Sequence, residues 1–182
     1  AGKCSEEEVY KIEMLMNQAG ITVHDRPVVD VALSRAEETE APAAALELAD
    51  GRMITGKTTD LLGPCAALLL NALKELAGIP HSQPVISPAA IEPIQTLKTQ
   101  YLGSKNPRLH MDEVLIALSV SAASDPNAQK ALEQLPNLKG CQAHTSVMVS
   151  DVDRKLFMKL SIQATFEAKY ENNSVIFPKK GI

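Results

Sequence analysis

The residues that decide the fold run from Gly103 to Ala123 and read GSKNPRLHMDEVLIALSVSAA. The first half of this stretch is polar and carries more reactive side chains than any other part of the chain. The second half, residues 114–123, is apolar apart from two serines, which predicts a buried helix. It is shorter than the roughly 20 apolar residues that a membrane span needs. Because a polar loop that leads into a buried helix holds functional groups in fixed positions, we expect the functional site here.

The polar half of this stretch supplies the main residues of the predicted site. Lys105 and Arg108 come just before the helix, where free backbone amides and the helix dipole favour anions. His110 and Glu113 lie one turn apart and are predicted to form a proton-transfer pair. The alternative is a solvated cluster of salt bridges that only caps the buried helix. The predicted ligand-binding residues here are Lys105, Asn106 and Arg108, and the predicted catalytic residues are His110 and Glu113.

Three residues elsewhere in the sequence are predicted to bind the same ligand. Lys57 and Thr58 follow a predicted strand, and in a layered α/β fold strand ends and helix starts meet at one rim. His144 lies on another predicted strand, on the same face as Ser146. Cys141 is three residues from His144, so its side chain points to the opposite face and a nucleophile–base pair is disfavoured. We interpret Cys141 as a buried structural cysteine.

Residues 51–58 read GRMITGKT and match the phosphate-loop pattern GxxxxGK[ST] letter for letter. A phosphate loop is followed by a long helix that starts at the lysine. Here the residues between the glycines are β-forming, and Gly63-Pro64 would interrupt a helix that began at Lys57. Asp50-Gly51 is typical of a two-residue hairpin turn. We therefore predict a hairpin and keep a phosphate-loop nucleotide binder as an alternative function.

The composition is that of a soluble globular protein, with 182 residues, 45% hydrophobic and 22% charged. A formal net charge of -4 argues against a nucleic-acid partner, because phosphate binding needs a basic surface. Three Tyr, three Phe and no Trp argue against base stacking. Three cysteines without a CxxC pair favour a reducing cytoplasm and give no zinc-ligand pair. We therefore expect a cytoplasmic protein with no metal, no cofactor, no nucleic-acid partner and no membrane contact.

Helix caps and hydrophobic periodicity predict a helical lead-in at residues 1–42 and an α/β sandwich domain with a mixed sheet at residues 43–182. The lead-in contains two helices, the first capped by Ser5 and Glu8. In the sandwich, strands alternate with helices along the chain, and two later helix starts are predicted from Ser87 with Pro88 and from Ser150 with Asp153. The predicted elements are helices at 5–19 and 25–39, a hairpin from 43, a helix at 65–77, a short strand at 84–87, a helix at 88–102 kinked at Pro93, helices at 114–123 and 125–135, a strand at 141–149, a helix at 150–160 and a strand at 162–168.

Three segments resemble a bacterial family of uncharacterised proteins that is catalogued only as a domain of unknown function. They are DGRMITGKTTDLLG at 50–63, NPRLHMDEVLIALS at 106–119 and LKGCQAHTS at 138–146. Family members are considerably longer, and this chain resembles their C-terminal part over nearly all of residues 5–170. The resemblance implies a three-layer α/β/α sandwich with the layering of cytidine deaminases. It implies no deaminase chemistry, because Leu68 replaces the second cysteine of the P-C-x-x-C ligand pair and no H-x-E occurs upstream.

Our leading functional hypothesis is the small-molecule-binding half of a larger cytoplasmic bacterial enzyme, with a phosphorylated or carboxylate ligand. The missing N-terminal region of the full-length protein is the expected partner, because it would supply part of the active site. The rival hypothesis is a structural or oligomerisation domain, which would form a homo-oligomer without catalytic activity. Fold kinship alone does not decide between them.

Overall fold

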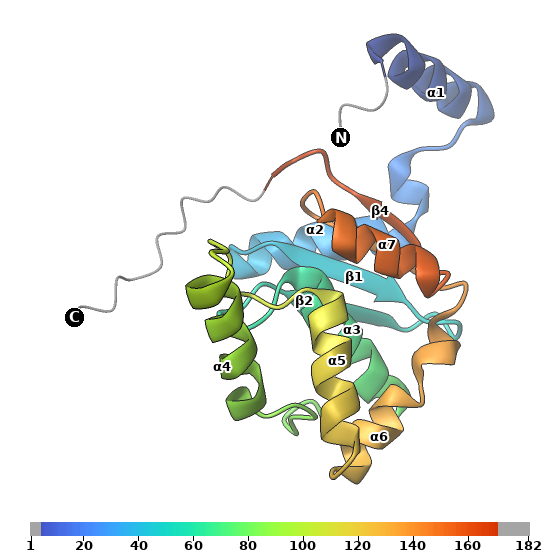
Figure 1. The fold of residues 1–182 in the computed structure, drawn as a ribbon. Coiled ribbons are helices and arrows are strands. Elements are labelled where there is room, and N and C mark those ends of the chain that lie inside the picture. The colour runs from blue at the N-terminus through green and yellow to red at the C-terminus, as the bar shows by residue number, and fades with distance from the viewer. Residues whose placement is uncertain (1–4, 171–182) are drawn as a thin grey trace.

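A mixed sheet of four strands, in the order β2-β1-β3-β4, lies at the centre of residues 5–170, the part of the chain that the computed structural model describes (Figure 1). Strand β1 is antiparallel to both β2 and β3, whereas β3 and β4 are parallel. The predicted α/β class with a mixed sheet is confirmed. The strands are β1 (Ala43–Glu47), β2 (Met53–Lys57), β3 (Gln142–Thr145) and β4 (Gln163–Phe166).

Helices cover both faces of this sheet (Figure 1). Helix α2 packs on one face, α3 and α7 pack on the other, and α5 and α6 lie outside α3. A further likeness to the layering of cytidine deaminases stays a prediction. Within the described residues the helices are α1 (Glu6–Ala19), α2 (Pro27–Thr39), α3 (Pro64–Leu76), α4 (Pro88–Thr96), α5 (Met111–Ala122), α6 (Pro126–Leu132) and α7 (Asp151–Lys159), with short 3-10 turns η1 (Val23–Asp25) and η3 (Leu135–Leu138) and a π-helical turn η2 (Leu97–Tyr101).

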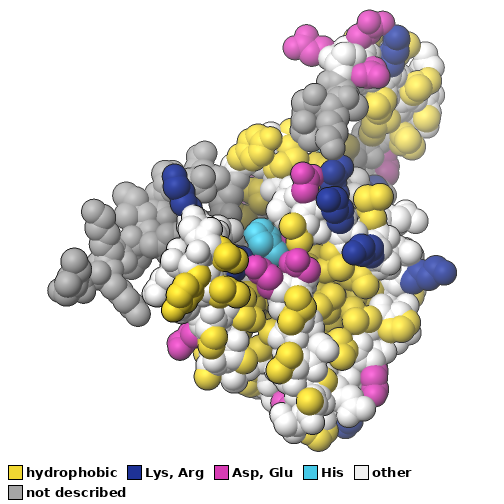
Figure 2. Space-filling view, in the orientation of Figure 1, with side chains coloured by type: hydrophobic (Ala, Val, Ile, Leu, Met, Phe, Trp, Pro, Cys, Tyr) yellow, Lys and Arg dark blue, Asp and Glu magenta, His cyan; other side chains and the backbone are white. Residues whose placement is uncertain are grey.

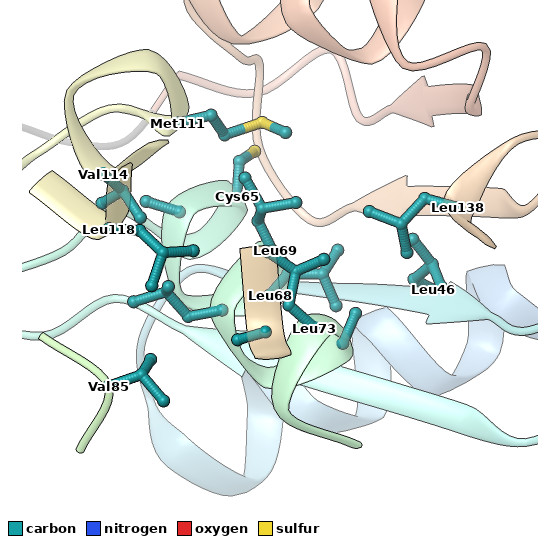
Figure 3. Packing of buried hydrophobic residues seen from close by; sticks show 14 of the residues in the cluster. Leu46, Cys65, Leu68, Leu69, Leu73, Val85, Met111, Val114, Leu118 and Leu138 are labelled. Carbon is teal, nitrogen blue, oxygen red and sulfur yellow. The ribbon is translucent and has the colours of Figure 1, made fainter. Parts of the chain in front are cut away.

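Helix α3 is the central element of the hydrophobic core. Nine of its residues are buried, and its leucines lie between Leu46 of β1 and Leu118 of α5 (Figure 3). The Gly63-Pro64 pair explains where α3 starts, because Pro64 occupies the first helical position, where an amide hydrogen is not needed. The core is almost entirely aliphatic, and it holds the free thiols of Cys65 and Cys141.

Residues 51–58 form one arm of a hairpin, as predicted, and the phosphate-loop alternative is wrong. The Gly51 amide donates to the Leu48 carbonyl and the Leu48 amide donates to the Arg52 carbonyl, both at 2.9 Å. This pattern closes a three-residue loop with Gly51 at φ 83°, one residue longer than the predicted Asp-Gly turn. Lys57 ends strand β2, and the next helix starts only at Pro64.

The second glycine of the phosphate-loop pattern has a packing role. A Cβ atom on Gly56 would lie 2.1 Å from the backbone nitrogen of Leu68 and 2.5 Å from its Cα. Strand β2 and helix α3 therefore touch backbone to backbone at this point. Only glycine permits that distance, so the second glycine of the pattern is explained by close strand–helix packing.

Several predicted element boundaries are corrected by the structure. Residues 84–87 form no strand, although Val85 and Ile86 are buried. Strand β3 ends at Thr145, well before residue 149. Helix α2 begins at Pro27 and not at Asp25, because Asp25 belongs to the preceding 3-10 turn, where its carboxylate accepts from the Thr22 amide at 2.5 Å. The predicted tail beyond residue 170 lies outside the described residues.

Helix α5 is buried on one side only, whereas the sequence predicted burial all round. Met111, Val114 and Leu118 are buried, but Ile116 is 63% exposed and Val120 is 71% exposed. The π-helical turn η2 adds another exposed apolar group, and Figure 2 shows hydrophobic side chains over α4 and α5 on the same side of the molecule. Exposed apolar patches of this kind mark contact surfaces. The members at η2 and the residue after it are Leu97, Tyr101 and Leu102.

The two helices of the predicted lead-in differ in their packing. Helix α1 has no buried residue and lies apart from the sheet (Figure 1). Helix α2 instead packs Val28 and Ala32 against Ala45 of β1. The predicted domain boundary at residue 43 stays a prediction, but α2 belongs physically to the packed sheet. No helix within residues 5–170 combines the length and apolar content that crossing a bilayer requires.

We expect Gly56→Ala to lower the free energy of unfolding by about 3 kcal/mol or more, because the added methyl group must push β2 and α3 apart. The matched control is Gly63→Ala, where the new Cβ would meet only the Leu109 carbonyl at 3.7 Å. That control should change stability by no more than about 0.5 kcal/mol. Denaturant unfolding of both variants checks this, and equal effects would contradict the packing role of Gly56.

Candidate functional site

Three helices begin around one small cavity of about 170 Å³. The residues that cap their N-termini, Gly63 of α3, His110 of α5 and Ser150 of α7, all line it. The first amides of a helix lack partners within the helix, and the dipole makes this end partly positive. This arrangement favours negatively charged groups, and the carboxylate of Asp153 is one that the protein itself supplies. The other lining residues are Pro64, Cys65, Asn106, Arg108, Val147, Met148, Val149 and Asp153.

The buried carboxylate of Asp153 joins two of these helix ends. Asp153 is 7% exposed and lies in the first turn of α7. Its Oδ1 accepts from the Met111 amide at 2.8 Å, which caps α5. Its Oδ2 accepts from Ser150 Oγ at 2.9 Å and lies 3.1 Å from Nδ1 of His110. The imidazole is therefore held in one orientation by contacts to its Nδ1.

The charges of this pair shift both pKa values toward the ionised forms. The hydrogen bond to Asp153 raises the pKa of His110, although burial of the ring opposes this. Burial by itself would raise the pKa of Asp153, but the hydrogen bonds from His110 and the Met111 amide, the charge of His110 and the hydroxyl of Ser150 outweigh it and leave the pKa lowered. A histidine of this kind can donate a proton near neutral pH and take a new one from solvent, while the adjacent carboxylate orients the ring and stabilises its charged form.

Glu113 does not face the imidazole of His110, so the predicted proton-transfer pair is not formed by these two side chains. Its Oε2 accepts from the His110 backbone amide at 2.8 Å and from Nζ of Lys98 at 2.7 Å. Lys98 also donates to the Arg108 carbonyl at 2.6 Å. Glu113 therefore fixes the backbone before α5, and Asp153 takes the place beside the ring that the sequence assigned to Glu113.

The loop before α5 brings two of its predicted ligand-binding residues to the cavity. Asn106 Oδ1 accepts from the Arg108 amide at 3.1 Å, and Arg108 Nε donates to the Thr59 carbonyl at 2.8 Å. The loop is also held by the Leu109 amide, which donates to the Leu61 carbonyl at 2.9 Å. Asn106 and Arg108 line the cavity, whereas Lys105 is exposed and does not.

The remaining three predicted residues lie elsewhere. Lys57 lines a different cavity beside α3, and the Thr58 amide donates to the Pro42 carbonyl at 2.8 Å. His144 pairs across the sheet with Ala45, which packs on α2, so it lies on the face opposite His110. It is 4% exposed, its Nδ1 lies 2.8 Å from Thr165 Oγ1, and burial lowers its pKa.

Among the cavity residues that were not predicted from the sequence as site residues, three have polar or reactive side chains, namely Cys65, Ser150 and Asp153. Ser150 and Asp153 were recognised only as the cap of α7, which the structure confirms through the Asp153 amide and Ser150 Oγ at 3.1 Å. The Asp153 carboxylate also accepts from the Met111 amide, 42 residues away in the sequence, and this contact depends on the tertiary fold. Cys65 also lines the cavity, but burial and then the charge of Asp153 raise the pKa of its thiol well above the ordinary value. It is therefore a neutral thiol instead of a nucleophile.

A metal centre is not formed by the side chains that the structure describes. Among residues 5–170, no three His, Cys, Asp or Glu side chains are grouped closely enough to hold an ion. In the cavity, His110 and Asp153 lie together, and their third neighbour is the hydroxyl of Ser150.

Residues 24–176 match the family model described as "Domain of unknown function DUF1846, C-terminal". The chain belongs to this family. Similar proteins include a UPF0371 protein of Corynebacterium glutamicum (strain R), 55% identical over 165 residues, covering 91% of this chain and 33% of the relative. A UPF0371 protein of Streptococcus pneumoniae (strain CGSP14) is 48% identical over 171 residues, covering 94% of this chain and 35% of the relative.

The chain thus spans about a third of the length of the curated relatives that it matches. The resemblance inferred from the three sequence segments is confirmed, including the greater length of the family's members. The structure shows which elements these three segments form. The first forms β2 and the approach to α3, the second forms the loop and start of α5, and the third forms β3 with its preceding turn.

We expect His110→Gln to destabilise the protein more at about pH 5.5 than at about pH 8.5. The raised pKa of His110 means that its stabilisation is complete below the ordinary histidine pKa of about 6.5 and is lost as the pH rises through the folded-state value. The lowered pKa of Asp153 keeps its own contribution intact until the solution becomes acidic. A charge-assisted hydrogen bond of this kind contributes about 1.5–3 kcal/mol.

Denaturant unfolding of the wild type and the variant at both pH values measures this difference. The control is His24→Gln, because His24 pairs with Asp30 on the surface and is 64% exposed. If His110→Gln lowers the free energy of unfolding by the same amount at both pH values, protonated His110 does not contribute through Asp153.

Proposed function

We propose that this chain is the small-molecule-binding part of a larger cytoplasmic bacterial enzyme, and that it binds an anionic ligand, a phosphate or a carboxylate, in the cavity beside His110. The single observation that carries the proposal is the convergence of three helix N-termini on one cavity that also holds Arg108. Each N-terminus contributes partial positive charge, and Arg108 adds a planar donor suited to phosphate or carboxylate oxygens.

In the proposed site, each residue has a distinct role. Arg108 and Asn106 contact the anion, and Lys105 attracts it from the exposed part of the loop. His110 moves a proton to or from the ligand, while Asp153 orients the ring and stabilises its charged form. Glu113 is a positioning residue, because its carboxylate holds the His110 backbone and Lys98.

The region that precedes this part in the longer relatives is the proposed partner of the site. His110 is partly exposed. Apolar side chains of η2 and α5, the elements that flank it, are exposed to solvent as well. A neighbouring region that packs on these side chains would also close the cavity against water, which strengthens charge interactions inside it. A homo-oligomer that covers the same residues is the alternative, and it fits the rival hypothesis of a structural domain.

Thermal unfolding with inorganic phosphate and with acetate tests the proposal. A site filled at a hundredfold excess over its dissociation constant adds about 2.7 kcal/mol to the stability of the folded state. We expect Arg108→Gln to remove this stabilisation while the ligand-free protein still folds cooperatively. Arg154→Gln is the matched control, because Arg154 pairs with Asp151 in the first turn of α7 but does not line the cavity.

Two other outcomes would contradict the proposed anion site. If Arg108→Gln mainly lowers the melting temperature and neither anion stabilises the wild type, the loop serves to hold α5 in place. Retained phosphate stabilisation in Arg108→Gln would place the anion elsewhere. Either result would remove the proposed site and leave the oligomerisation hypothesis.

A further inference from the structure

A second and larger cavity of about 470 Å³ lies between β2, α3 and the connection from Ile79 to α4. Its floor is apolar and consists in part of Leu70, Val85 and Ile91, which are buried. Its polar lining is basic or neutral, and none of the residues that form it is Asp or Glu. The polar and charged lining residues are Arg35, Thr55, Lys57, Thr59, Asn71, Lys74 and His81.

Lys74 is the unusual member of this lining. It is 7% exposed, and its ammonium donates to the His81 carbonyl at 2.7 Å. Among the residues that the structure describes, no carboxylate lies within ion-pair distance of it. Its helical neighbour Glu75 is instead bound by Arg52, which also binds Asp50.

The ammonium group of this buried residue has one carbonyl acceptor and no carboxylate beside it, so it has lost part of its hydration without gaining an opposite charge. Burial accordingly lowers the pKa of Lys74, and no nearby carboxylate raises it again. An anion supplied from outside would complete the ion pair that the described residues do not give Lys74.

We propose that this cavity binds a small organic anion with an apolar body, with the charged group against Lys74 and Lys57 and the apolar part on Leu70, Val85 and Ile91. Asn71 is held by a hydrogen bond from its Nδ2 to the Thr55 carbonyl at 2.8 Å, which fixes it beside Lys74 on α3. Gly56 and Lys57, which match the GK of the phosphate-loop pattern, would thus line an anion site of a different kind.

This site is independent of the cavity beside His110. The two cavities have no lining residue in common. The segment between β2 and α3 separates them, because Thr59, Leu61 and Leu62 line the larger cavity and residues 63–65 line the smaller one. All residues of the larger cavity lie between positions 35 and 91, so the 182-residue chain suffices for its test.

Octanoate and octanol are suitable probes, because they share an apolar chain and differ in charge. Methyl NMR of the 182-residue protein should show octanoate-dependent shifts at Val85 and Ile91, with much weaker shifts for octanol. In Lys74→Met, the dissociation constant for octanoate should rise at least tenfold. Lys130→Met, an exposed position on α6, should leave it unchanged.

Two further measurements separate binding from a structural role. Lys74→Met without ligand should melt at a higher temperature than the wild type, because a buried uncompensated charge is replaced by an apolar side chain of similar length. If that variant fails to fold, the exposed Lys57→Gln variant should still fold and bind octanoate several-fold more weakly.

The proposal is wrong if octanoate and octanol give the same shifts, or if the shifts appear at Val147 and Val149 of the smaller cavity. It is also wrong if octanoate affinity is unchanged in Lys74→Met while the melting temperature falls, since Lys74 would then serve only to hold the His81 carbonyl. Absence of any shift up to the solubility limit of octanoate would equally overturn it.

Discussion

The direct backbone contact between Gly56 and Leu68 is the constraint on which the rest of the structure depends. It sets the distance between strand β2 and helix α3, and α3 carries the largest share of the core. Both cavities are built around this helix, because its N-terminus opens on the smaller one and its flank lines the larger one. A methyl group at position 56 would therefore disturb the fold and both candidate sites together.

Asp153 and Lys74, two of the buried charged residues that the structure describes, are compensated in different ways. Asp153 receives hydrogen bonds from the Met111 amide and the Ser150 hydroxyl and lies beside His110, so the cost of its burial is offset inside the protein. Lys74 has one carbonyl acceptor and no described carboxylate. Selection for stability alone would replace Lys74 with an apolar residue, whereas a bound anion that pairs with its charge would favour the lysine. Asp153 is thus balanced by groups of the protein itself, whereas Lys74 is the residue for which we propose a bound anion.

Local signals in the sequence predicted most elements of the fold. The Ser5–Glu8 capping box, Ser87 with Pro88, and Ser150 with Asp153 all place helix starts where the structure has them, because a cap depends on residues within one turn. Long-range contacts could not be predicted in this way. The partner of His110 is 43 positions distant, and the face on which His144 lies depends on strand register. The exposed side of α5 was missed because its outer residues are as apolar as its buried ones.

Helix α1 has 14 residues and none of them is buried. Its order rests on local interactions, chiefly the capping box at Ser5 and the Glu7–Lys11 ion pair at 2.7 Å. Isolated helices of this length are only marginally stable in water. Its amide protons should therefore exchange with solvent through frequent local opening, whereas those of α3 should exchange only when the whole protein unfolds. Any contact that the longer relatives make with α1 would appear first as slower exchange along this helix.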